Sequence, residues 1–379
     1  MSPFVASWGI IGCGWISSMF VKDLCVVRPD VTDVAHSIAA VGSRDTSKAE
    51  AFIAENCPKG GPAQSNGLVE AGPVACGSYQ EVYENKAVNV IYIGTLNNTH
   101  YTEVKAAIEA GKNVLVEKPA CLNVEEWDSL VSIAKQRGLF LMEGVWTRFL
   151  PLAYELQDQL FNKKVIGDVK NVTANFSMAF YNIVPDSHRN FALESAGGAM
   201  FDLGPYIVLC AILALYHNPA NERNKPENVR GVMSKARTGV DLSTTILMDF
   251  PKLEANAVLT TSFAYCSPKD ERCIITGTKG EIVLNDGLSR LTQMTIKQID
   301  QEPAPRILKW KENVVVSKSL PGFGLMFEAD AVARSLRDGQ LENPRMPHEE
   351  SRMVLEIFDQ VRKQNEYVLP DGIEKIKPQ

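Results

Sequence analysis

The chain has 379 residues, a formal net charge of −6 at pH 7, and 45% hydrophobic and 22% charged residues. This composition is typical of a globular protein and excludes a mostly disordered or fibrous chain. The length predicts two domains, because a single hydrophobic core rarely grows beyond about 250 to 300 residues. The acidic balance without a long basic run argues against nucleic acid or a membrane surface as the main partner and favours a small molecule.

The eight cysteines are scattered, with no Cys-x-x-Cys pair and no nearby cluster of histidines. We therefore expect neither a disulfide framework nor a metal site. The stretch Met1 to Ser7 lacks a basic region followed by an apolar segment, and we find no run of about 18 uninterrupted apolar residues. These features predict a cytoplasmic protein that does not cross a membrane.

Up to about residue 150, short apolar runs alternate with segments in which apolar residues recur every three or four positions. This alternation predicts βαβ units and a doubly wound parallel sheet, that is, a Rossmann-type α/β domain over residues 1–150. The segment Cys57–Gly72, rich in Gly, Pro and polar residues, predicts a surface insertion. The expected strands are Trp8–Ile11, Ile38–Val41, Val90–Ile93, Asn113–Val116 and Phe140–Glu143, and the expected helices are Ile16–Cys25, Ser47–Glu55, Thr99–Ala110 and Val124–Gln136.

From residue 151 to 379, alternating strands rich in β-branched residues predict an α+β domain built on a largely antiparallel open sheet. We expect this domain to bind the substrate and to mediate dimerisation. Its expected strands are Val169–Ser177, Val229–Lys235, Ser243–Met248, Ala255–Phe263, Arg272–Gly277 and Glu281–Leu284, and its expected helices are Met200–Tyr216, Met326–Arg337 and Glu349–Arg362.

A glycine-rich turn follows the first expected strand and precedes the first expected helix. Gly12 permits a tight turn, Gly14 lets the backbone approach a pyrophosphate, and the first helical N–H groups face that anion. Ser17, a small residue, replaces the third glycine of the motif. Such a turn can be purely structural, but its place between strand and helix favours dinucleotide binding. The residues expected to contact the cofactor here are Gly12, Cys13, Gly14, Trp15 and Ile16.

The end of the second expected strand indicates which dinucleotide binds. Where an NAD enzyme carries an acid for the ribose hydroxyls, this chain has Ser43 and Arg44, which suit a 2′-phosphate. NADP is therefore favoured over NAD. The alternative is that Arg44 is a solvated turn residue and Asp45 is the displaced acid. Further residues expected near the cofactor are Lys48, then Thr95, Leu96, Asn97 and His100 in the polar loop after Val90–Ile93, and Glu117, Lys118 and Pro119.

The motif Glu117-Lys118-Pro119 at a strand end resembles the Gfo/Idh/MocA oxidoreductases, and the resemblance covers essentially the whole chain. A second block supports it, because Gly197 to Tyr206 is similar to the family pattern Gly-Gly-x-x-x-Asp-x-Gly-x-(His/Tyr). The resemblance implies catalytic roles for Lys118 and Tyr206. It also implies a cis Lys118-Pro119 bond, which is plausible because only X–Pro bonds adopt the cis form cheaply.

The chemistry of these residues also follows from their types and spacing. Asp202 and Tyr206 are four positions apart in a helical segment, so they share a face and can address one substrate. Alcohol oxidation by hydride transfer needs a group that takes the hydroxyl proton, and a tyrosine can do so if an ammonium such as Lys118 lowers its pKa. Asp202 would position the hydroxyl or orient Lys118. Taken singly, Lys118 could be a surface lysine and Tyr206 a core aromatic.

Tyr206 occupies the position at which most members of the resembled family have histidine. This departure indicates the branch of NADP-dependent D-xylose 1-dehydrogenases and dimeric trans-dihydrodiol dehydrogenases. We expect oxidation of an aldopyranose, with D-xylose at C1 as the first candidate; the alternatives are a dihydrodiol substrate or a non-catalytic NADP-sensing regulator. The resemblance further implies a homodimer that pairs through the second sheet. The residues expected to line the substrate pocket, any of which could instead be interdomain packing, are Trp146, Arg148, Phe149 and His188.

Overall fold

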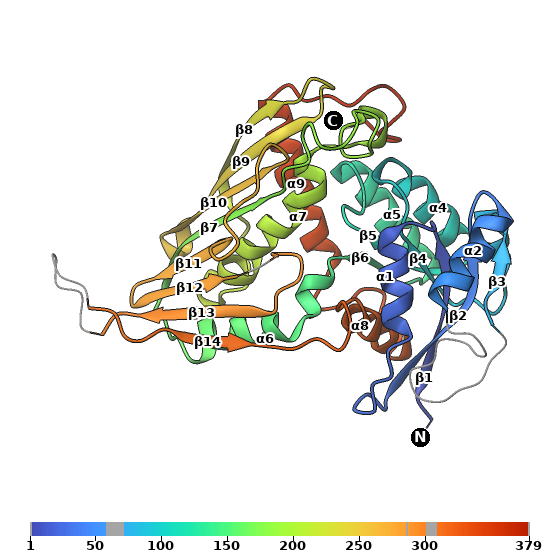
Figure 1. Cartoon of the computed structure of the whole chain (residues 1–379), viewed down its shortest axis with the longest axis horizontal. Coiled ribbons are helices and arrows are strands. Elements are labelled where there is room, and N and C mark those ends of the chain that lie inside the picture. Colours follow the sequence, from blue (N-terminus) through green and yellow to red (C-terminus); the bar gives the residue numbers. More distant parts are fainter. Residues whose placement is uncertain (1, 58–71, 286, 301–308, 378–379) are drawn as a thin grey trace. The chain divides into compact units, whose positions relative to one another are not determined.

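The computed structural model describes residues 2–57, 72–285, 287–300 and 309–377 (Figure 1). The chain forms two compact units, which differ from the expected domains 1–150 and 151–379. The first unit ends at Trp146 and also contains two later segments, Pro321–Arg352 and Glu374–Gln379. The second unit comprises Thr147–Leu320 and Met353–Ile373. The chain therefore returns twice to the Rossmann unit after completing most of the second unit.

The first unit contains a six-stranded parallel sheet in the order β3-β2-β1-β4-β5-β6. This is the strand order of a Rossmann fold, so the predicted fold of this part is confirmed. Strand β4 is buried along its whole length, as expected for a strand covered on both faces. The strands are β1 (Phe4–Ile11), β2 (Val34–Gly42), β3 (Val74–Cys76), β4 (Val90–Ile93), β5 (Asn113–Glu117) and β6 (Leu141–Gly144).

Some helices of this unit begin where a short polar side chain caps them. Asp45 and Asn123 accept backbone N–H bonds at the starts of α2 and α5, and Gly138 ends α5 in the left-handed conformation. Of the predicted insertion, residues 58–71 lie outside the described residues. The helices are α1 (Trp15–Leu24), α2 (Thr46–Asn56), α3 (Tyr79–Glu84), α4 (His100–Glu109), α5 (Val124–Arg137) and α8 (Met326–Arg337), and α9 (His348–Gln364) begins here and continues into the second unit.

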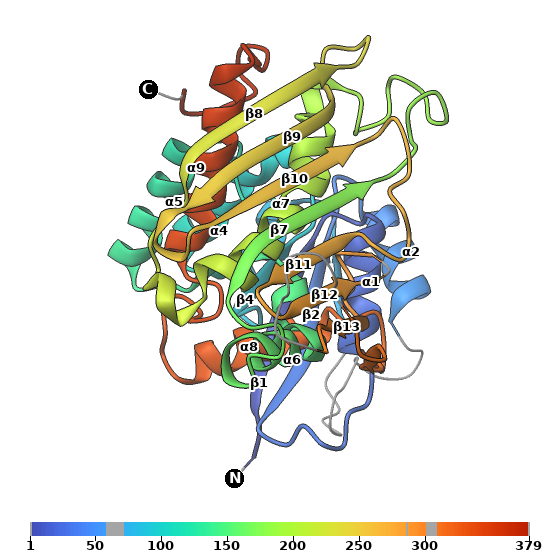
Figure 2. The ribbon, with the colours of Figure 1, turned by 90° about the vertical axis from the view of Figure 1, so that its left-hand side faces the viewer.

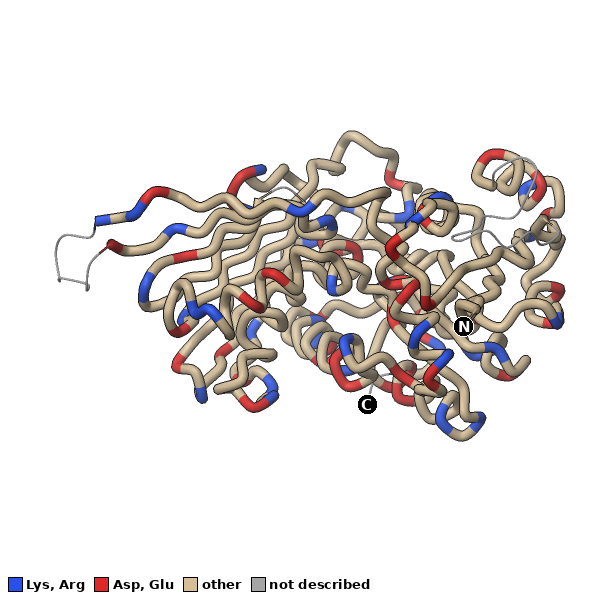
Figure 3. Tube along the Cα trace, turned by 90° about the horizontal axis from the view of Figure 1, so that it is seen from below, with Lys and Arg blue, Asp and Glu red and all other residues tan. Residues whose placement is uncertain are grey.

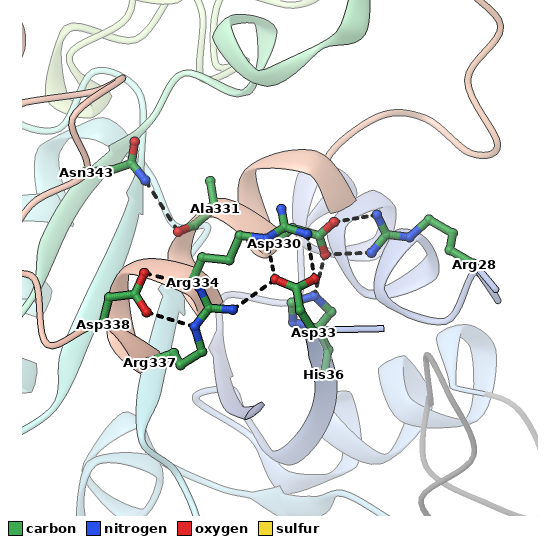
Figure 4. Close-up of polar contacts among 9 residues, drawn as sticks. All are labelled: Arg28, Asp33, His36, Asp330, Ala331, Arg334, Arg337, Asp338 and Asn343. Atoms are coloured by element: carbon green, nitrogen blue, oxygen red, sulfur yellow. Dashed lines mark hydrogen bonds and ion pairs between the residues drawn. The ribbon is translucent and has the colours of Figure 1, made fainter. Parts of the chain in front are cut away.

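Helix α8 is tied to the Rossmann sheet by a buried carboxylate (Figure 4). The two terminal guanidinium nitrogens of Arg28 donate to Asp330 at 2.6 Å, and His36 Nε2 lies 2.9 Å from the same carboxylate. Trp8 donates its indole N–H to His36 Nδ1, so Nε2 carries the proton that faces Asp330. This network explains why the segment belongs to the first unit although it follows the second in sequence.

The start of the α8 segment is held by a second carboxylate. Asp23 of α1 accepts the backbone N–H groups of Phe323, Gly324 and Leu325 at 2.8, 2.6 and 2.7 Å. These amides have no partner inside the helix, so Asp23 serves as a cap supplied from another element. Helices α1 and α8 are therefore fixed to each other at their polar ends.

The second unit contains an eight-stranded sheet in the order β14-β13-β12-β11-β7-β10-β9-β8. Its pairs are antiparallel except β7 with β10, which confirms the predicted largely antiparallel sheet. In Figure 2 the helices α7 and α9 lie behind these strands. The strands are β7 (Val169–Ser177), β8 (Glu227–Lys235), β9 (Asp241–Phe250), β10 (Ala255–Ser262), β11 (Cys273–Gly277), β12 (Gly280–Leu284), β13 (Gln293–Gln298) and β14 (Val314–Ser317), and the unit also holds α6 (Pro151–Gln157).

Helix α7 (Ala199–Ala211) is the core helix of the second unit and continues as a wider turn over Ile212–Tyr216. The span Ala199–Tyr216 is long and apolar enough to cross a membrane. However, 94% of it is buried inside the protein, as is usual for the central helix of a packed domain.

Candidate active site

The glycine turn connects β1 to α1 and lies against Gly94, the residue that follows β4. Gly12 has φ +90°, and a Cβ there would lie 2.6 Å from the carbonyl oxygen of Gly94, so only glycine fits. At Gly14, the N-cap of α1, a Cβ would meet nothing closer than 3.9 Å. No side chain of the described residues caps α1. Its first amides and the open space at Gly14 fit a pyrophosphate, at the switch point where this fold binds ligands.

The residues at the end of β2 could bind the adenosine ribose in one of two ways. Either Arg44 binds a 2′-phosphate, or Asp45 binds the ribose hydroxyls. Asp45 Oδ1 accepts both the backbone N–H and the hydroxyl of Ser47 at 2.9 Å. These hydrogen bonds lower the pKa of Asp45, and its carboxylate caps α2. Ser43 is buried, whereas Arg44 and Lys48 are exposed. The donor set at this strand end therefore suits a 2′-phosphate better than a pair of ribose hydroxyls.

His100 lies between two loops that carry predicted cofactor contacts. Its Nδ1 is 2.8 Å from the carbonyl oxygen of Pro119, and its Nε2 is 3.4 Å from that of Thr95. The side chain is completely buried, so its contacts tie these two loops together. In the same loop, Leu96 is exposed and Asn97 begins a short 3₁₀ turn.

Glu117 and Lys118 stand at the carboxyl end of β5, and the Lys118-Pro119 bond is cis as expected. Glu117 is buried and accepts a hydrogen bond of 2.6 Å from the Tyr92 hydroxyl. Burial raises the pKa of Glu117, although Tyr92 and the charge of Lys118 oppose the rise. Lys118 therefore lies beside the carboxyl group of Glu117, whose pKa is raised.

A second buried acid near this strand end was not predicted as a site residue. Glu328 of α8 is completely buried, and neither of its carboxyl oxygens has a hydrogen-bonding partner among the described residues. Burial and the nearby charge of Glu117 raise the pKa of Glu328 well above its ordinary range. The two carboxyl groups cannot both ionise cheaply in this dry environment.

The predicted proton acceptor lies on helix α7 in the second unit. Tyr206 is 7% exposed and packs edge-on against Phe176, with ring centroids 5.8 Å apart. Asp202, one turn earlier, has carboxyl oxygens 3.4 Å from Arg189 Nη2 and 3.5 Å from Asn190 Nδ2. Asp202 and Tyr206 thus occupy one face of one helix, as their spacing predicts.

Of the predicted substrate-pocket residues, His188 lies in the second unit, and its Nδ1 accepts the backbone N–H of Asn190 at 3.3 Å. The side chain of Asn190 in turn contacts Asp202. Arg148 and Phe149, also in this unit, are buried. Trp146 ends the first unit and is likewise buried.

Phe323 is a further aromatic residue that the sequence analysis did not single out. Its ring stacks on Trp146 with centroids 5.1 Å apart and meets Trp15 edge-on at 5.5 Å. Trp15 is 65% exposed beside the glycine turn. The only sequence signal for Phe323 is its position between two glycines, which could equally mark a loop.

These two units define a dinucleotide-binding oxidoreductase. Two family models match the chain: "Oxidoreductase family, NAD-binding Rossmann fold" over residues 6–145, and "GFO/IDH/MocA C-terminal domain" over residues 155–283. The chain belongs to the Gfo/Idh/MocA oxidoreductase family, which confirms the resemblance drawn from the motifs.

Among the described residues, no group of three or more His, Cys, Asp or Glu side chains could hold a metal ion.

Two relatives match over nearly their whole length. The D-xylose 1-dehydrogenase (NADP(+)) of Hypocrea jecorina is 31% identical, with 98% of this chain and 95% of the relative covered. The trans-1,2-dihydrobenzene-1,2-diol dehydrogenase of Sus scrofa is 32% identical, with 94% of this chain and 96% of the relative covered. Identity at this level fixes the family but leaves the substrate open between a sugar and a diol.

Solved structures share the fold at lower identity. A 3-ketoreductase from Actinomadura kijaniata, in complex with NADP and TDP-benzene, superposes with a TM-score of 0.75 at 22% identity, covering 96% of this chain and 98% of that one. An aldose-aldose oxidoreductase from Caulobacter crescentus gives a TM-score of 0.73 at 18% identity, covering 97% and 98%. These matches confirm the two-unit architecture.

Proposed function

We propose that the protein oxidises a CH–OH group of an aldopyranose with NADP+, and that D-xylose, oxidised at C1 to a lactone, is its first candidate substrate. The observation that carries the proposal is the pairing of Asp202 with Tyr206 on one face of α7 in a chain that also retains Lys118 at the end of β5. A regulator that only senses the cofactor has no need of such proton-handling groups. The full-length similarity to a D-xylose 1-dehydrogenase supports the sugar.

The cofactor supplies the hydride acceptor. Tyr206 accepts the proton of the reacting hydroxyl, and Lys118 donates a hydrogen bond to the same oxygen and favours the ionised form of Tyr206. Asp202 positions the hydroxyl of the sugar. The amides at the start of α1 hold the pyrophosphate, and Arg44 holds the 2′-phosphate.

A trans-dihydrodiol is the second candidate substrate. It would use the same Lys118 and Tyr206 but would need a more apolar pocket. The aromatic cluster of Trp15, Phe323 and Trp146 favours it, because these rings offer flat apolar faces. The similarity to a dihydrodiol dehydrogenase supports it as well.

A spectrophotometric panel separates the candidates. Purified protein is offered NADP+ or NAD+ with D-xylose, D-glucose, L-arabinose or a benzene dihydrodiol, and formation of the reduced cofactor is followed. We expect the highest kcat/KM for D-xylose with NADP+. A higher value for the dihydrodiol would replace the sugar by the diol. Tight NADPH binding without turnover of any compound would favour the non-catalytic regulator.

A further inference from the structure

Helix α7, which carries Asp202 and Tyr206, begins at a glycine pair and has no capping side chain of its own. Its first turn instead faces Asp241, the first residue of β9, which is completely buried. Asp241 Oδ2 accepts the backbone N–H of Met200 at 2.7 Å and the Thr244 hydroxyl at 3.1 Å. The cap is thus provided by a residue 41 positions from Met200 in sequence.

The same carboxyl group explains one glycine of the family motif. Gly198 has φ +120°, and a Cβ at this position would lie 1.9 Å from Asp241 Oδ1. No side chain can occupy that space, so the backbone of the motif and the carboxyl group of Asp241 are in direct contact. Close approach of this kind leaves the start of α7 little freedom to shift.

We propose that Asp241 is a positioning residue, whose carboxyl group fixes the first turn of α7 and thereby the places of Asp202 and Tyr206. This inference rests on the proposed function, in which those two side chains act on the substrate. Asp241 itself does not touch the substrate. Asp202 is two residues beyond Met200, and Tyr206 follows one helical turn later. Both side chains lie within two turns of the cap, with Pro205 between them, so a shift of the first turn displaces them.

The ionisation of Asp241 makes this cap sensitive to pH. Burial raises its pKa to about 7, against the opposing hydrogen bonds from Met200 and Thr244. Below that pH the carboxyl group is neutral and caps more weakly, because hydrogen bonds to an ionised acceptor are stronger. We therefore expect kcat to rise as Asp241 ionises.

The charged and titratable groups on the neighbouring elements are engaged with other partners. Lys235, opposite Asp241 on β8, donates to the carbonyl oxygen of Glu366 at 3.2 Å. Tyr367 donates its hydroxyl to the Gly197 carbonyl at 3.4 Å, and Asp202 on α7 faces Arg189 and Asn190. On β10, Thr261 donates to the Ala199 carbonyl at 3.3 Å. The groups that bond to the Asp241 carboxyl are themselves neutral, so burial dominates its ionisation.

The test uses the full-length variants Asp241→Ala and Asp241→Asn, with Asp249→Asn on the same strand as the matched control. Asp249 accepts a hydrogen bond from Asn228 at the exposed surface and has no part in the site. In Asp241→Ala we expect kcat with D-xylose to fall by about 10²-fold, because small misplacements of reacting groups have effects of this size. The Kd for NADP+ should stay unchanged, because the cofactor residues belong to the first unit.

Asp241→Asn keeps an oxygen for the Met200 amide but cannot ionise. We expect its kcat to exceed that of Asp241→Ala and to stay at every pH near the level that the wild type has below pH 7. The variant therefore lacks the rise of kcat near pH 7 that the wild type and Asp249→Asn show. Hydrogen exchange at the first turn of α7 provides a readout that needs no turnover, and we expect exchange about tenfold faster in Asp241→Ala, in keeping with the loss of a helix cap.

Unchanged exchange at Met200 in Asp241→Ala would overturn the proposal. So would Asp241→Asn with the wild-type pH profile, which would assign the ionisation to another group and stays decisive if Asp241→Ala does not fold. If the wild type oxidises none of the sugars or the diol, the proposed function fails, and the exchange measurement still decides whether Asp241 fixes the helix.

Discussion

Arg44 is the side chain on which the choice of cofactor depends. It is exposed at the end of β2, and its neighbour Asp45 is occupied with capping α2. We predict that Arg44→Ala raises KM for NADP+ far more than KM for NAD+, because only NADP+ carries the 2′-phosphate. Steady-state kinetics with both cofactors checks this, with the exposed Arg137→Ala as control. An equal effect on both cofactors would show that Arg44 does not recognise the phosphate.

Tyr206 and Lys118 carry the proposed proton transfer. Tyr206→Phe and Lys118→Met should each lower kcat by about 10²-fold or more, because a positioned acid–base group contributes at least that much. NADP+ binding, measured by quenching of tryptophan fluorescence, serves as the control for Tyr206→Phe and should be unchanged. Near-normal turnover in either variant would remove that residue from the mechanism.

The residues that sequence analysis could find are those in short local motifs. Gly12 and Lys118 follow directly after strands and Arg44 stands two residues after one, where the fold places ligands, so their positions could be predicted from spacing alone. Glu328 and Asp241 could not be found in this way. Each matters through a neighbour more than 40 positions away, Glu117 for the first and Met200 for the second, and no local pattern records that contact.

At the scale of elements, α8 depends on the buried network of Asp330 with Arg28 and His36. Burial acts to raise the pKa of Asp330, but the hydrogen bonds from His36 and Arg28 and the charge of Arg28 outweigh it and lower the pKa. A carboxyl group with a lowered pKa contributes stability above its ordinary pKa of about 3.9, and that contribution is lost as pH falls through the folded-state value.

We predict that Asp330→Asn lowers the free energy of unfolding of the first unit by about 3 to 5 kcal/mol at pH 7, because it leaves Arg28 buried without its anion. Urea denaturation monitored by hydrogen exchange in α8 measures the effect. Asp338→Asn at the exposed end of the same helix is the control and should change little. The loss of stability in Asp330→Asn should shrink as the pH falls below about 4, because there the carboxyl group of the unfolded wild type takes up a proton. If the difference in free energy of unfolding between Asp330→Asn and the wild type stays constant down to pH 3, the role assigned to Asp330 is contradicted.

The elements predicted from the sequence include most of the long periodic ones and the short buried strand β4, whereas β13 and α6 were not predicted. Strand β7 and helix α8 agree with their predicted bounds, and most others agree within a few residues. Strand β3 has three residues and α3 has six, too few to show a period. Strand β14 is an edge strand with little burial, so it lacks the apolar alternation that marks a half-buried strand.

At the scale of the molecule, we propose that two copies pair through the sheet of the second unit. Two large apolar side chains are exposed on adjoining strands, Val232 of β8 at 73% and Leu247 of β9 at 45%. Helices α7 and α9 lie behind the sheet in Figure 2. Lys and Arg residues lie among Asp and Glu residues along both units in Figure 3.

We predict that sedimentation equilibrium gives about twice the mass of one chain. The double variant Val232→Glu/Leu247→Glu should give the mass of one chain, because charges would be buried in the pairing surface. Val368→Glu, at an exposed apolar residue outside the sheet, is the control and should remain a dimer. A monomeric wild type at micromolar concentration would contradict the pairing.

The central claim is that hydride passes from C1 of an aldopyranose to NADP+ in this protein. The most direct measurement supplies D-xylose deuterated at C1 and follows the label by mass spectrometry of the reduced cofactor. The account predicts that every molecule of reduced cofactor carries one deuterium and that Tyr206→Phe forms the same labelled product more slowly. Reduced cofactor without deuterium, or no reduced cofactor from D-xylose at all, would contradict it.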